Sequence, residues 1–134
     1  MRTLEDWKIK IAVLWVFLAV GFSAMTMLSL VMPGGIEQII AGEIEGMPID
    51  ESLLFFVAIF WLVPLTMAVL SLTLKNSANR WVNIIVGIVW LILGIIDLGD
   101  TLNRGWLTLA LLALSKTVAA VLIVWYAWKS KQKT

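Results

Sequence analysis

The sequence predicts an all-α membrane protein, a bundle of four transmembrane helices with both termini in the cytoplasm. Hydrophobic residues make up 61% of the chain and charged residues 14%, a balance far from that of soluble domains. The apolar residues also form four blocks, each long enough to cross a hydrocarbon core of about 30 Å as a helix. We expect one domain over residues 1–134, with spans at about 11–32, 52–74, 81–99 and 106–128 and an extracytoplasmic acidic loop at 33–51.

The first span stops at Pro33 and carries small or weakly polar residues on one face, among them Ala12, Ala19, Ser23 and Thr26. Small side chains let helix backbones approach closely in lipid, so this pattern predicts a helix-packing face. A polar stripe that lines a pore is the alternative.

The loop at 33–51 is rich in acids and contains no lysine or arginine. Its acidic residues are Glu37, Glu43, Glu45, Asp50 and Glu51. Clustered oxygen ligands suit Ca²⁺ or Mg²⁺, but the spacing matches no recognised ion-binding loop. We therefore expect a solvated acidic loop, no metal site and no cofactor.

The second span contains Pro64 near its centre. Proline has no N–H and displaces the carbonyl four residues earlier, here that of Phe60. In a membrane this carbonyl needs another donor, so Phe60 and Pro64 are candidates for an intramembrane polar site. A simple kink without a specific partner is the other interpretation.

The third span places Asn83, Gly87, Trp90, Gly94 and Asp97 on one helix face, because their spacings alternate between four and three. The glycines predict a close helix contact, with Asn83 and Asp97 at its two ends. A ligand-binding face is the alternative.

Lys116 lies about 15 Å inside the fourth span, close to the bilayer midplane. It shares a helix face with Ala113 and Ala120, and an ionisable residue at this depth marks a candidate site. Three interpretations stay open. Lys116 pairs with Asp97 or the Phe60 carbonyl and fixes helix register; it binds an anion, a lipid headgroup or a transported proton; or it is a neutral amine.

The basic residues indicate the orientation, since cytoplasmic loops of membrane proteins carry an excess of lysine and arginine. The two ends of the chain and the turn at 75–80 contain Arg2, Lys8, Lys10, Lys75, Arg80, Lys129, Lys131 and Lys133. The other two connections contain only Arg104. We expect both termini in the cytoplasm and the protein in the cell membrane.

The chain contains no cysteine and no histidine, which excludes disulfides, thiol catalysis, histidine-ligated haem and the usual zinc sites. No acidic pair is predicted at membrane depth, and we expect no enzymatic activity. The basic residues flank apolar spans instead of forming a soluble patch, so we expect no nucleic-acid partner. The expected partners are the lipid bilayer and a second copy or another membrane protein.

Three motifs near helix ends suggest a family. They are Pro33-Gly34-Gly35-Ile36, the run from Asn79 to Ile85 with Gly87, and the run from Ile123 to Trp128. Through them the chain resembles a family of small four-helix prokaryotic integral membrane proteins with no assigned activity. This resemblance implies the fold and transfers no functional residue. In size the chain is also similar to the small multidrug transporters, but these use a glutamate in the first helix, and the first span here has no acid.

Two classes of function stay open. One is a non-enzymatic interaction subunit, accessory subunit or lipid-binding bundle, and the alternative is a small oligomeric permease or channel that uses Lys116. An interaction subunit predicts a dry, paired Lys116 and a groove of small residues open to lipid. A permease predicts that Lys116 is accessible to water.

Overall fold

The computed structural model describes residues 6–44 and 46–130, and it is predominantly α-helical. Its long helices are α1 (Asp6–Val31), α3 (Glu51–Thr73), α4 (Asn76–Asn103) and α5 (Leu107–Lys129). In the described part of the chain, these four helices are long and apolar enough to cross a membrane. The predicted all-α class is therefore confirmed at the level of the fold.

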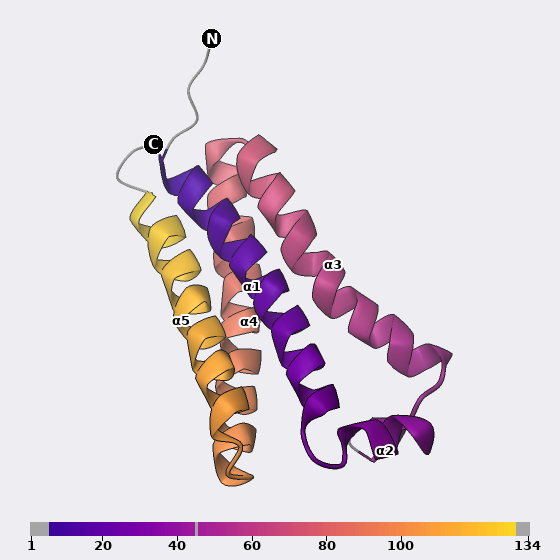
Figure 1. Ribbon diagram of the computed structural model, residues 1–134. Coiled ribbons are helices and arrows are strands. Elements are labelled where there is room, and N and C mark those ends of the chain that lie inside the picture. Colours follow the sequence, from indigo (N-terminus) through magenta and orange to yellow (C-terminus); the bar gives the residue numbers. More distant parts are fainter. Residues whose placement is uncertain (1–5, 45, 131–134) are drawn as a thin grey trace.

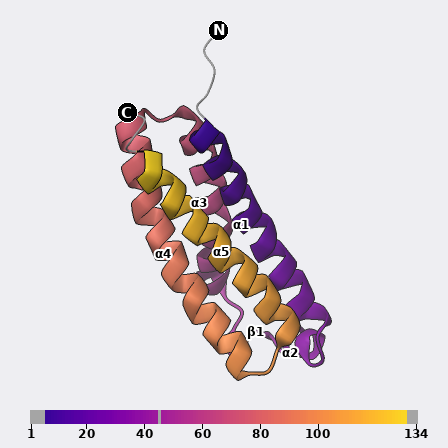
Figure 2. The ribbon, with the colours of Figure 1, turned by 90° about the vertical axis from the view of Figure 1, so that its left-hand side faces the viewer.

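The four long helices lie side by side in the spatial order α3, α1, α5, α4 (Figures 1 and 2). α1 packs against both α3 and α5, and α5 packs along α4. α3 and α4 follow each other in sequence but have little backbone contact, and Figure 1 shows them diverging away from their short connection. One end of the bundle contains this short connection together with residues 6 and 130, and we call it the terminus end. We call the opposite end the loop end.

The hydrophobic core lies toward the terminus end. Its fully buried side chains include Ile11 and Trp15 from α1 and Ile123 from α5, while α3 contributes Met67 and Ala68. All buried residues of α3 come from its second half. The bundle is therefore tightly packed at the terminus end and more open at the loop end.

The connection between α1 and α3 contains more structure than the sequence predicted. α1 ends before Pro33, and Gly34 takes a left-handed conformation (φ 86°) that starts the short helix α2 (Gly35–Ile40). A two-stranded antiparallel hairpin follows, β1 (Glu43–Ile44) paired with β2 (Met47–Pro48). The sequence predicts a solvated acidic loop here, and neither this short helix nor this hairpin.

Both ends of α3 are explained by local interactions. The Asp50 side chain accepts a hydrogen bond from the Leu53 N–H at 2.9 Å and caps the helix. At the other end Leu74 is extended, and α4 starts almost at once. This short connection makes α3 and α4 antiparallel.

The helix α4 is longer than the predicted span, which ended near Gly99. It continues to Asn103, and Arg104 forms an exposed ion pair with Asp100 at 3.2 Å across one turn. Gly105, with φ 76°, then reverses the chain into α5. Asp97 therefore lies six residues, or about 9 Å, inside the end of the helix.

Candidate functional site

Lys116 of α5 faces Asp97 of α4. The ammonium Nζ lies 3.7 Å from Asp97 Oδ2, an ion pair slightly longer than a direct hydrogen bond. The Lys116 side chain is 16% exposed and that of Asp97 36%. The structure thus contains the Lys116–Asp97 pair that the sequence suggests, and the lysine is the more enclosed of the two residues.

The stem of Lys116 is accommodated by α1. A Cβ added to Gly21 would lie 3.1 Å from Lys116 Cγ and 3.3 Å from Cδ, so the lysine stem occupies the space that a larger residue would fill. The Lys116 ammonium also lies 5.6 Å from the ring centroid of Phe22, within the range of a cation–π contact. Three helices therefore enclose this lysine.

Phe60 belongs to the surroundings of Lys116 through its ring. The ring stacks on Phe22 with centroids 5.7 Å apart and lies 5.8 Å from the ring of Trp90. The described contacts of the Lys116 ammonium are with Asp97 and Phe22, and the carbonyl of Phe60 is not among them. Aromatic side chains from α1, α3 and α4 thus form a row between Lys116 and the core, where the Trp90 ring lies 6.1 Å from that of Trp15.

Asn83 lies in a second polar cluster, closer to the terminus end. Its Oδ1 accepts hydrogen bonds from Trp15 Nε1 at 2.7 Å and from Ser71 Oγ at 3.2 Å. Its Nδ2 donates to Asn79 Oδ1 at 2.6 Å, and Asn79 Nδ2 donates to the Ser71 carbonyl at 2.7 Å. All four side chains are fully buried. The cluster satisfies polar groups that would be costly to bury unpaired.

The five candidate polar-site residues are therefore not brought together in one place. Lys116, Asp97 and the Phe60 ring lie in one region. Asn83 is 14 positions before Asp97 on the same helix, which places it about 21 Å away. Pro64 is fully buried near the middle of α3.

The predicted packing faces are largely occupied by contacts within the chain. Ala19, Ala113 and Ala120 are buried. An added Cβ at Gly87 would lie 2.9 Å from Val124 Cγ2, and one at Gly94 would lie 2.9 Å from Thr117 Oγ1. α5 therefore fits against the glycines of α4.

Ser23 is the exception among the predicted packing residues, because it is exposed. Its hydroxyl donates to the Ala19 carbonyl at 3.1 Å and accepts a hydrogen bond from Trp61 Nε1 at 2.6 Å. Ser23 thus links α1 to α3 through a hydrogen bond at the molecular surface.

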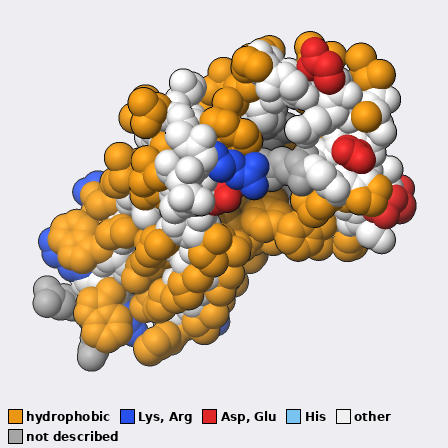
Figure 3. Space-filling model, turned by 90° about the horizontal axis from the view of Figure 1, so that it is seen from below, with side chains coloured by type: hydrophobic (Ala, Val, Ile, Leu, Met, Phe, Trp, Pro, Cys, Tyr) orange, Lys and Arg blue, Asp and Glu red, His pale blue; other side chains and the backbone are white. Residues whose placement is uncertain are grey.

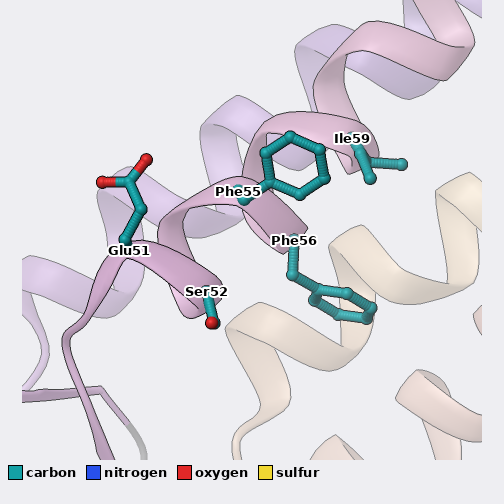
Figure 4. A pocket seen from close by; sticks show the side chains of 5 residues that line it. All are labelled: Glu51, Ser52, Phe55, Phe56 and Ile59. Atoms are coloured by element: carbon teal, nitrogen blue, oxygen red, sulfur yellow. The ribbon is translucent and has the colours of Figure 1, made fainter.

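A hollow of about 510 Å³ lies on the first turns of α3 and is separate from the ion pair. It is lined by Glu51, Ser52, Phe55, Phe56 and Ile59. Figure 4 shows the two phenylalanines and Ile59 pointing away from the Glu51 carboxylate. The hollow is an open, mostly apolar part of the surface.

The acidic side chains of the α1–α3 connection spread over one side of the loop end (Figure 3). Glu45 lies outside the described residues. Within the described ranges, no three acidic side chains come close enough together to hold a metal ion.

Sequence reasoning missed Trp15, Ser71 and Asn79 as partners of Asn83. The pair Asn79 and Asn83, four residues apart at the start of an otherwise apolar helix, was a usable signal, because such residues face the same side. The sequence has no comparable signal for the partners, which come from α1 and α3.

Taken together, the fold and its two polar clusters define a small bundle of helices with membrane-spanning length. The chain belongs to DUF6326, a family of unknown function, whose model matches residues 3–134. No curated protein and no solved structure shows significant similarity to the chain.

Proposed function

We propose that the chain is a multi-pass integral protein of the cell membrane, with both termini in the cytoplasm and the acidic connection outside. Its four apolar helices support insertion. The distribution of charge supports the orientation, because the terminus end carries Lys8, Lys10, Lys75, Arg80 and Lys129, whereas the connection at 33–50 has only acids. Arg2, Lys131 and Lys133 lie outside the described residues.

We further propose that the protein acts as a non-enzymatic interaction subunit in the bilayer. The carrying observation is the enclosure of Lys116, whose ammonium faces Asp97 at 3.7 Å and whose stem packs on Gly21. An enclosed and paired charge fixes the register of α1, α4 and α5. The function then depends on contacts at the surface of the bundle.

The surface offered to a partner is large and apolar. The predicted groove of small residues is filled within the chain, so a second copy or another membrane protein would bind the exposed apolar rows of α3 and α4. The outward side chains of α4 include Ile85, Ile88, Ile92, Ile95 and Ile96. Lipid tails cover such apolar rows as well as a protein partner does. A partner therefore displaces lipid only where it packs closely against these rows.

Cysteine labelling tests this proposal, since the natural chain has no cysteine. The variants are Lys116→Cys, Ser52→Cys at the loop end and Ser77→Cys at the terminus end, each treated with a membrane-impermeant maleimide on intact cells. We expect labelling of Ser52→Cys at once, of Ser77→Cys only after permeabilisation, and of Lys116→Cys only after denaturation. The reverse order for Ser52→Cys and Ser77→Cys would overturn the orientation.

A permease that uses Lys116 is the second candidate, and two observations favour it. The Asp97 side chain remains 36% exposed, and α3 diverges from α4 toward the loop end (Figure 1). Rapid labelling of Lys116→Cys in intact cells, at a rate close to that of Ser52→Cys, would favour the permease over the interaction subunit.

A further inference from the structure

Arg80 is buried near the start of α4, and it forms no ion pair with an acidic residue in the described ranges. It is 7% exposed, and its Nε is buried and forms no hydrogen bond. The ion pairs among the described residues are Arg104 with Asp100 and Lys116 with Asp97, so none involves Arg80. A buried Nε–H group that lacks an acceptor is costly, which points to a ligand.

Two tryptophans hold the guanidinium. Its carbon lies 4.7 Å from the ring centroid of Trp81 and 5.1 Å from that of Trp128, so α4 and α5 each contribute one ring. The residues Trp81 and Trp128 are 49% and 57% exposed. Contacts with ring faces stabilise the positive charge but supply no acceptor for the N–H groups. We call Arg80, Trp81 and Trp128 the arginine cradle.

The same arrangement is repeated around the cradle. Lys129 Nζ lies 4.8 Å from the ring centroid of Trp125, and Lys10 Nζ lies 5.4 Å from that of Tyr126. Among the described residues of the terminus end, the only acid is Asp6. The surroundings of the cradle are therefore strongly positive.

We propose that the arginine cradle binds the phosphate of an anionic lipid headgroup. Arg80 is four residues from the start of α4, about 6 Å along the helix, which is the headgroup level if the chain crosses the membrane as proposed. Tryptophan and tyrosine concentrate at that level, and anionic lipids attract basic residues there. The guanidinium presents its N–H groups to a phosphate in a planar fork, which a lysine lacks.

The test uses the full chain purified in a nonionic detergent. Its thermal unfolding midpoint is measured during titration with dioctanoylphosphatidylglycerol, dioctanoylphosphatidylcholine or inorganic phosphate. We expect the midpoint to rise with phosphatidylglycerol and not with the other two compounds. Arg80→Gln should weaken the affinity for phosphatidylglycerol about tenfold, as expected for the loss of one charge-assisted contact.

Lys75→Gln is the matched control, because Lys75 is an exposed basic residue at the same end. It should bind phosphatidylglycerol as the wild type does. If Arg80→Gln does not fold, Arg80→Lys keeps the charge without the fork and should still bind more weakly than the wild type.

Three results would overturn the proposal. The first is an affinity for phosphatidylglycerol that is unchanged in Arg80→Gln, or in Arg80→Lys where Arg80→Gln does not fold. The second is an equal loss of this affinity in Lys75→Gln. The third is equal stabilisation of the protein by phosphatidylglycerol and phosphatidylcholine. Stabilisation by inorganic phosphate alone would identify a soluble anion instead of a lipid as the ligand. Because the protein is in detergent, these outcomes are independent of the orientation that the labelling experiment tests.

Discussion

Trp15 of α1 donates its indole N–H to the side-chain oxygen of Asn83 on α4 at 2.7 Å, although the two residues are 68 positions apart. The same oxygen accepts a hydrogen bond from Ser71 of α3. One buried oxygen therefore joins three helices at the terminus end, and all three side chains are fully buried.

Asn83→Ala should strongly destabilise the protein. The substitution leaves the indole N–H of Trp15 and an amide oxygen of Asn79 without their partner, and buried unsatisfied groups cost about 1–3 kcal/mol each. We expect a loss of roughly 2–4 kcal/mol in the free energy of unfolding, measured by denaturant titration in detergent. Ser77→Ala, at an exposed position of the same helix, is the control and should change little.

The ion pair between Lys116 and Asp97 should respond unequally to removal of its two members. Asp97→Asn leaves the more enclosed ammonium without a counter-charge and should cost roughly 2–3 kcal/mol, whereas Lys116→Met leaves a more exposed carboxylate and should cost about 1 kcal/mol. Replacing both residues should restore most of the stability. A double-mutant cycle measures this coupling, and additive losses would show that the pair does not contribute.

Gly87→Ala should destabilise the contact between α4 and α5. The added methyl would lie 2.9 Å from Val124 Cγ2 and 3.3 Å from Ile123 Cγ2, and such overpacking costs about 1–3 kcal/mol. Gly99→Ala on the same helix is the matched control, because nothing lies within 4 Å of its added Cβ. This control should be neutral or stabilising by up to about 1 kcal/mol, since alanine favours the helix. Equal effects of the two changes in thermal unfolding would contradict the packing.

Gly21→Ala tests how α1 holds the Lys116 stem. The new methyl would approach Lys116 Cγ at 3.1 Å, so the flexible stem must shift by a few tenths of an ångström, at a cost of at most about 1 kcal/mol. In a Lys116→Ala background this cost should disappear. If Gly21→Ala has the same effect on the melting temperature in both backgrounds, the two residues do not interact.

Much of the fold could be predicted because apolar blocks separated by charges leave few alternatives to long helices. The hairpin was missed because its two-residue strands have no periodicity to detect. The extension of α4 to Asn103 was missed because Asp97 and Asp100 looked like the end of an apolar span. Their helix continues at the surface, where Arg104 and Asp100 pair across one turn.

The candidate site was predictable only in part. Helical spacing places Lys116 on the side of the small residues, and the pair with Asp97 that the sequence suggests is present at 3.7 Å. Spacing alone could not show that Asn83 and Asp97, on one face of α4, meet different neighbours. That difference depends on the divergence of α3 from α4, which no local pattern in the sequence encodes.

The spatial order α3, α1, α5, α4 has a consequence for biogenesis. The ribosome makes α1 first, yet one of its two neighbours, α5, is the last helix to be made. During synthesis α1 and α3 can join early, while the alanine-rich contact with α5 must wait for the final hairpin of α4 and α5. Until then Gly21 and Trp15 lack their partners from that hairpin, so an insertase or chaperone that shields this side of α1 would increase the yield of assembled protein.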